Sequence, residues 1–213
     1  MRLRFWIKQG VQNLAIILGA SLLYAFLMFI QMDDGLGGLL VQLPMYLLLF
    51  GAMLMIATTV GVYKFSVPLV LGFGSTRNEV LLGLQICRVI PVLIVPALAM
   101  VLTMVSGEPA SFPPVDILVL GIGAFLLFSA IGTVLGAVFT KYGRIAAVIT
   151  AVTIFLTAFG GGVLAGLLGE ETILQTIFSS AFLPWLVLSI GLFCYSLSMI
   201  PEHRIVWKCN VKL

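Results

Sequence analysis

Long apolar stretches separated by short polar connections dominate the chain. A helix that crosses a bilayer needs about 20 apolar residues. Six stretches have about that length, over residues 13–31, 39–62, 80–105, 116–139, 145–168 and 181–200. The connections between them are too short to hold a further soluble domain. The pattern predicts an all-α integral membrane protein, with six transmembrane helices in a single transmembrane domain over residues 1–213.

Two amphipathic segments flank or interrupt these spans. Residues 1–12 are basic, and Leu3, Trp6 and Val11 share one helical face, which predicts an interfacial helix on the membrane surface. A frayed basic start is the alternative. Residues 171–180 also have one apolar face, which predicts a short helix dipping into the outer leaflet, or else an amphipathic loop. Residues 201–213 read as a basic cytoplasmic tail.

Charge supports this count of spans. The chain is 62% hydrophobic and only 9% charged, whereas a soluble domain has about 25% charged residues. Every lysine and arginine falls on one side of the six-span topology, and six of the eight acidic residues fall on the other. Because positive residues favour the cytoplasmic side, we expect both termini in the cytoplasm of a multi-pass plasma membrane protein, in a bacterial cytoplasmic membrane.

The segment from Lys64 to Arg88 forms the longest polar interruption between two spans, and we call residues 65–79 the elbow. Pro68 begins a short apolar piece, and Gly72 and Gly74 permit a tight turn because glycine tolerates backbone angles that other residues avoid. Thr76 and Glu79 have the spacing of a capping box. A helix is therefore predicted to begin at Thr76 and to continue into the third span.

Three polar residues share one face of that third helix. Arg77, Gln85 and Arg88 fall within about 80° of one another, since each residue turns an α-helix by about 100°. This face suggests a surface for a cytoplasmic partner, whereas an ordinary loop whose arginines only set orientation is the alternative. Arg88 is expected to extend back to the cytoplasmic surface, and a buried functional arginine is the alternative.

Glycine pairs predict close helix packing. Gly132 and Gly136 form a GxxxG pattern in the fourth span, and Gly162 and Gly166 form another in the fifth. Such spacing lets helix backbones approach closely in lipid. It serves packing inside the bundle or a dimer interface, and the pattern does not choose between them.

Motifs for catalysis by this chain are missing from the sequence. There is no GxxxxGK[ST] phosphate-binding loop. The only histidine, His203, lies after the last span, so no histidine activates a serine inside the membrane. The three cysteines are Cys87, Cys194 and Cys209, and their spacing predicts neither a metal site nor a redox pair. We expect no enzymatic activity of the chain alone, no metal site, no cofactor and no nucleic-acid partner.

The elbow, which reads Phe65-Ser66-Val67-Pro68 and then Gly72-Phe73-Gly74-Ser75-Thr76-Arg77-Asn78-Glu79, resembles that of the small permease subunits of type-2 ABC exporters. The initial surface helix, the six spans and the Pro184-Trp185 pair are similar too. The resemblance implies a separate cytoplasmic ATPase subunit that carries ATP and Mg. It also implies a second permease copy or a homologous permease, and contact with membrane lipids. It implies ATPase coupling through Phe65, Pro68, Leu69, Leu71, Gly72, Phe73, Gly74, Ser75, Thr76, Arg77 and Glu79.

The same resemblance implies that the second and fifth spans lie near the translocation path. Their few polar side chains are Tyr46, Thr58, Thr59, Thr150, Thr153 and Thr157. This scarcity favours an apolar or amphipathic cargo, such as a peptide, a lipid or a drug.

Two other functions remain open from the sequence. One is a substrate-capturing membrane subunit of a vitamin importer, which would need polar ligand-binding outer loops. The other is a non-transport membrane scaffold or a peptide-immunity protein, which would need no ATPase partner. Co-purification of a nucleotide-binding subunit through the elbow would separate the exporter from the scaffold, and ligand binding by the isolated chain would favour the importer.

Overall fold

The computed structural model describes residues 2–31, 36–106, 113–142, 152 and 182–208. These residues form helices and short connections, with no β-strand among them. The elements in chain order are α1 Arg2–Gln31, α2 Leu36–Gly61, the π-helix η1 Val62–Ser66, α3 Val67–Gly72, α4 Arg77–Ser106, α5 Pro114–Tyr142 and α8 Leu183–Lys208.

The all-α membrane architecture is confirmed for this part of the chain. Five candidate spans are long and apolar enough to cross a bilayer: Leu3–Leu27, Leu43–Gly72, Arg77–Ser106, Pro114–Thr140 and Leu183–Arg204. They correspond to five of the six predicted spans. The predicted fifth span at 145–168 and the predicted outer helix at 171–180 lie outside the described residues. So do Gly162, Gly166, Thr150, Thr153, Thr157 and Cys209.

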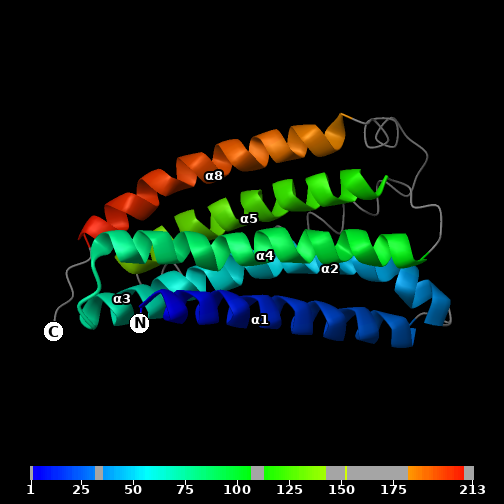
Figure 1. The fold of residues 1–213 in the computed structure, drawn as a ribbon, viewed down its shortest axis with the longest axis horizontal. Coiled ribbons are helices and arrows are strands. Elements are labelled where there is room, and N and C mark those ends of the chain that lie inside the picture. Colours follow the sequence, from blue (N-terminus) through cyan, green and yellow to red (C-terminus); the bar gives the residue numbers. More distant parts are fainter. Residues whose placement is uncertain (1, 32–35, 107–112, 143–151, 153–181, 209–213) are drawn as a thin grey trace.

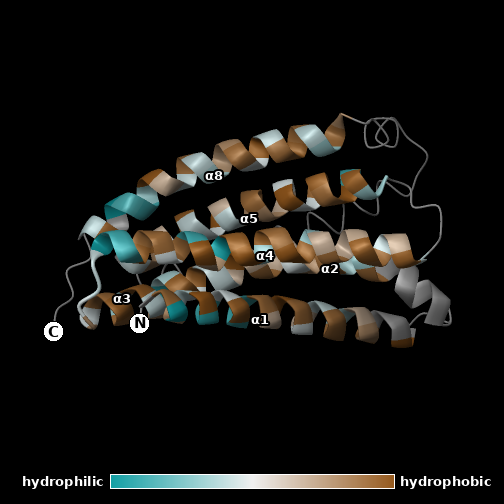
Figure 2. Cartoon of the chain, viewed as in Figure 1, coloured by the Kyte–Doolittle hydropathy of each residue, from teal (hydrophilic) through white to brown (hydrophobic). Residues whose placement is uncertain are grey.

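The long helices lie side by side along one common direction, with α1 at one side of the bundle and α8 at the other (Figure 1). The start of α1, the elbow and the end of α8 meet at one end of the bundle, and Figure 2 shows hydrophilic residues there. We call this the basic end, because Arg4, Lys8, Lys64, Arg77 and Arg204 lie on the helix segments that reach it. That this end faces the cytoplasm stays a prediction from the charge pattern.

The start of the chain differs from the predicted surface helix. Residues 2–12 are the first turns of the continuous helix α1, which extends from Arg2 to Gln31. Trp6 is fully buried in the bundle, and a Cβ added to Gly83 of α4 would overlap its indole ring. The apolar face of residues 1–12 is therefore partly taken up by α4, because Gly83 leaves room for the indole there. Leu3 and Val11 remain exposed.

The elbow continues the second span rather than forming a separate helix. The backbone stays helical from α2 through η1 into α3. Pro68 has no N–H to donate to the carbonyl group of Lys64, and the wider π-helical turn ends just before it, at Ser66. The second span therefore extends into the elbow as one helical segment.

A glycine C-cap and a capping box form the turn between α3 and α4. The N–H of Ser75 donates to Val70 O at 3.3 Å and that of Gly74 to Leu71 O at 3.0 Å. These are the two bonds of a Schellman motif, and they require the left-handed conformation that Gly74 adopts with φ of 75°. The N–H of Thr76 then donates to Glu79 Oε2 at 3.0 Å, and the N–H of Glu79 to Thr76 Oγ1 at 3.4 Å. The predicted capping box is confirmed.

Glycines also determine where the helices touch. A Cβ added to Gly132 would lie 2.9 Å from Thr59 Cβ, and one added to Gly136 would lie 2.8 Å from the Tyr63 ring. This glycine pair of α5 therefore packs inside the bundle, against α2 and η1. On another face of α5, a Cβ added to Gly191 of α8 would overlap the backbone at Gly123. The α5–α8 contact was not predicted from the sequence.

Candidate functional site

The outer face of the elbow is apolar and exposed. Phe65 is 65% exposed, Leu69 is 50% exposed and Phe73 is 78% exposed. The three residues are spaced four apart, so they lie along one side of the helical segment. We call them the elbow surface. On the inner side, Val67 and Val70 are buried and anchor α3 in the bundle.

Some of the other predicted coupling residues support the elbow from inside the bundle or build its turn, and others are exposed to the surroundings. Leu71 packs against the core that holds Val67 and Val70, whereas Pro68 is exposed beside the elbow surface. Gly72, Gly74, Ser75, Thr76 and Glu79 build the turn and the start of α4. Lys64 lies over the ring of Phe65, at 4.9 Å from its centroid, and over that of Phe139 of α5, at 4.8 Å. The elbow surface is thus carried by a well-supported turn.

Arg77 does not project freely toward a partner. Its guanidinium lies 5.1 Å from the ring centroid of Trp207 on α8, and His203 stacks on the same ring with centroids 5.6 Å apart. The prediction that Arg77, Gln85 and Arg88 share one face is confirmed. However, α8 contacts all three side chains, so this face is occupied within the chain.

Arg88 lies inside the bundle, contrary to the prediction from the sequence. It does not extend back to the surface, since its side chain is only 3% exposed. It forms an ion pair with Glu202 of α8, which is 1% exposed, and it donates a hydrogen bond to Thr133 Oγ1 of α5 at 2.7 Å. Its guanidinium also lies 5.0 Å from the Tyr195 ring centroid. A nearby carboxylate at the same depth compensates the charge, so Arg88 has no need to reach water.

Gln85 joins the same buried group of side chains. It donates from Nε2 to Glu202 Oε2 at 3.0 Å, and it accepts a hydrogen bond from the Tyr195 hydroxyl. Tyr63, from η1, lines the same small cavity as Arg88, and its buried hydroxyl makes no hydrogen bond within the described part of the chain. We call Tyr63, Gln85, Arg88, Thr133, Tyr195 and Glu202 the buried polar cluster. It joins η1, α4, α5 and α8.

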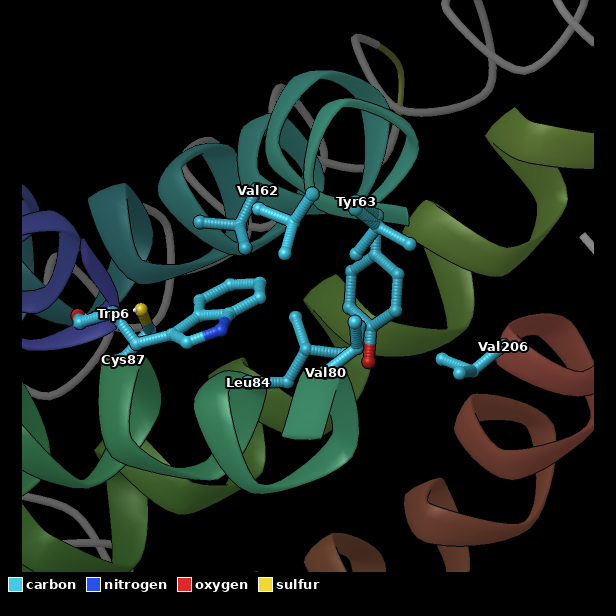
Figure 3. Close-up of a cluster of buried hydrophobic side chains, with 9 residues drawn as sticks. Trp6, Val62, Tyr63, Val80, Leu84, Cys87 and Val206 are labelled. Atoms are coloured by element: carbon cyan, nitrogen blue, oxygen red, sulfur yellow. Dashed lines mark hydrogen bonds between the residues drawn. The ribbon is translucent and has the colours of Figure 1, made fainter. Parts of the chain in front are cut away.

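An apolar cluster seals the buried polar cluster toward the basic end. Figure 3 shows Trp6 of α1 between Val62 and Leu84, with Tyr63 to their right in the same cluster. The thiol of Cys87 donates to the Trp6 carbonyl oxygen at 3.2 Å. Both side chains of the ion pair are almost fully buried, and electrostatic interactions are stronger in such surroundings than in water.

A small cavity lies beside Arg88, between α1, α2 and α4. Its volume is about 10 Å³, and Asn13, Thr58, Thr59 and Tyr63 are among the residues that line it. One water molecule needs about 10–15 Å³, so the cavity is far too small for a transported molecule. The structure brings the predicted path residues Thr58 and Thr59 together here. Tyr46 lies elsewhere, in edge-to-face contact with Tyr24.

Glu202 is the member of the buried polar cluster that the sequence pattern did not single out. It is one of only two acidic residues on the basic side of the predicted topology, and it lies two residues after the last predicted span. In the predicted topology Glu202 lies on the same side of the membrane as Arg88 and at a similar depth. This agreement in position was the signal that could have identified the pair. No spacing rule identifies it, because Arg88 and Glu202 are 114 residues apart.

Among the described residues, no three His, Cys, Asp or Glu side chains gather closely enough to hold a metal ion. Comparisons with protein-family models, with curated proteins and with solved structures find no match. The assignment of a function therefore depends on the geometry of the elbow surface and of the buried polar cluster.

Proposed function

We propose that the chain is the transmembrane permease subunit of an ATP-driven exporter of the type-2 ABC class. In this proposal a separate cytoplasmic subunit binds ATP and Mg and hydrolyses the nucleotide. That subunit docks on the elbow surface, and two permease copies, or this chain and a homologous one, form the translocation path.

The elbow surface is the single observation that carries the proposal. Three large apolar side chains are exposed at the basic end, on a turn held by a Schellman motif and a capping box. Exposed apolar groups of this kind are typical of protein interfaces when a polar rim surrounds them. Lys64, Thr76 and Asn78 are exposed polar residues close by in sequence. A partner that presents a groove for Phe65 and Phe73 would cover this surface.

The rigid connection from the elbow surface to α4 supports a coupling role. Phe73 caps the end of α3, and α4 begins four residues later, at Arg77. Because the capping box holds the first turn of α4, a displacement of the elbow must also move the start of α4. The cavity beside Arg88 is too small for cargo, so we assign the path to the surface between two permease subunits. The scarcity of polar side chains in the predicted second and fifth spans favours an apolar or amphipathic cargo.

The test is association with an ATPase subunit through the elbow surface. The full chain is purified in mild detergent from its native host, and co-purifying proteins are identified by mass spectrometry and assayed for ATP hydrolysis. We expect an ATP-hydrolysing, nucleotide-binding subunit with the parent chain. Phe73→Ser should reduce its recovery about tenfold, as expected for loss of one central apolar contact.

Leu3→Ser is the matched control, because Leu3 is 59% exposed on α1 at the same end of the bundle. It should leave recovery of the ATPase unchanged. If no ATPase co-purifies, or if Phe73→Ser and the parent recover it equally, the proposal is wrong. The elbow surface would then contact lipid headgroups, and a scaffold or immunity function would account for the chain. Tight binding of a vitamin by the chain alone would instead indicate an importer subunit.

A further inference from the structure

The two halves of α8 are attached to the bundle by different chemistry. Away from the basic end, its contact is with α5, where Gly123 and Gly191 bring the two backbones together. At the basic end, it meets α4 through Glu202 with Arg88 and Gln85, and through Trp207 with Arg77. Figure 1 shows α8 approaching the start of α4 at this end and separating from α4 toward the other.

Polar contacts connect the basic-end half of α8 to α4. In lipid there is no hydrophobic driving force between helices, so close packing of small residues and interhelical hydrogen bonds must hold them together. The glycine contact of α8 is with α5. Removing one partner of a buried ion pair also leaves an uncompensated charge in apolar surroundings, which is strongly unfavourable. The ion pair is therefore the main polar contact of this half of α8, beside the apolar contact of Val206, which is buried in the apolar cluster.

We propose that Arg88 and Glu202 form a clamp that fixes the basic-end half of α8 to α4. Gln85 and Tyr195 orient the carboxylate and the guanidinium within the clamp, and Thr133 ties it to α5. A displacement of the elbow is then passed to α8 as well as to α4. The clamp itself is a property of this chain, whereas its use in passing on elbow movement rests on the proposed function.

Hydrogen exchange of the full chain in lipid nanodiscs, followed by mass spectrometry, tests the clamp without any ATPase partner. The decisive variant is Arg88→Met, which removes the cation but leaves the sequence of α8 unchanged. We expect amide exchange in residues 198–208 to become about tenfold faster or more, because Glu202 loses its partner and moves toward water. Exchange in residues 185–192 should stay as in the parent, since the Gly123–Gly191 contact remains.

Two further variants make the result specific. Arg88→Lys keeps a positive charge near Glu202 but cannot reproduce the fork of contacts to Glu202 and Thr133, so exchange in residues 198–208 should rise, though less than in Arg88→Met. Arg4→Met removes an exposed cation at the same end and should change nothing. Unchanged exchange in residues 198–208 of Arg88→Met would overturn the clamp. An equal increase in both halves of α8 would also overturn it, because it would indicate general destabilisation.

The consequence for transport is separable from the elbow contact. If the chain is an ABC permease, Arg88→Met should keep its ATPase partner, because the elbow surface is intact. The rate of cargo transport should nevertheless fall by about tenfold or more. Phe73→Ser should instead lose the partner while exchange in residues 198–208 stays as in the parent. Failure of the clamp and failure of the proposed function thus give different results.

Discussion

The indole ring of Trp6 lies directly against Gly83, on a helix that begins some 70 residues later. The buried ring fills the space that a side chain at position 83 would need, and it joins the start of α1 to the third candidate span. This contact fixes the N-terminal turns in the bundle instead of leaving them on the membrane surface.

Gly83→Ala is therefore expected to destabilise the chain by roughly 1–3 kcal/mol, the usual cost of overpacking a filled site. Thermal unfolding in detergent measures the effect. Gly19→Ala is the matched control, because a Cβ there meets nothing within 4 Å. It should be neutral or slightly stabilising, since alanine favours helix more than glycine does. Equal stability of the two variants would show that Trp6 is not held against Gly83.

Gly74→Ala should weaken the elbow without affecting the spans. Gly74 is the only described residue with a positive φ, and the left-handed conformation costs a residue with a Cβ roughly 1–2 kcal/mol. Faster proteolytic cleavage between residues 65 and 79 would measure the loss. Gly72→Ala is the control, because Gly72 lies within α3. The cleavage rate of a Gly74→Asn variant should lie between those of Gly74→Ala and Gly72→Ala, because asparagine tolerates this conformation better than alanine does.

Gly191→Leu should separate α8 from α5. The leucine side chain would overlap the backbone at Gly123, and we expect a loss of about 3 kcal/mol because backbone atoms cannot move aside as side chains do. The melting temperature in detergent measures this loss. Ser189→Leu places the same side chain at an exposed position two residues away and should leave the melting temperature unchanged. A fall of equal size in both variants would contradict the close α5–α8 contact.

The topology is expected to have six spans with both ends inside the cell. After replacement of the native cysteines, single cysteines at Asp34, Glu108 and Glu171 should react with an impermeant thiol reagent added outside. Single cysteines at Gly143 and Phe73 should react only after the membrane is permeabilised. Labelling of Gly143 from outside would contradict the six-span topology.

Local features of this chain were determined by its sequence. The apolar stretches predicted five helices that the structure describes, because a run of about 20 apolar residues has few alternatives to a membrane-spanning helix. The capping box at Thr76 and Glu79 and the turn at Gly74 were also predictable, since their hydrogen bonds join residues only three to five positions apart. The shared face of Arg77, Gln85 and Arg88 followed from the helical period alone.

Only the tertiary structure decided what those faces contact. The sequence predicted a cytoplasmic partner for Arg77 and a surface position for Arg88, whereas α8 places Trp207 and Glu202 beside them. It also predicted a surface helix at residues 1–12, whereas Gly83 gives Trp6 a buried site. Hydropathy marks which segments enter the membrane but not which helices become neighbours. That choice depends on the fit of small residues and on buried polar partners far apart in the chain.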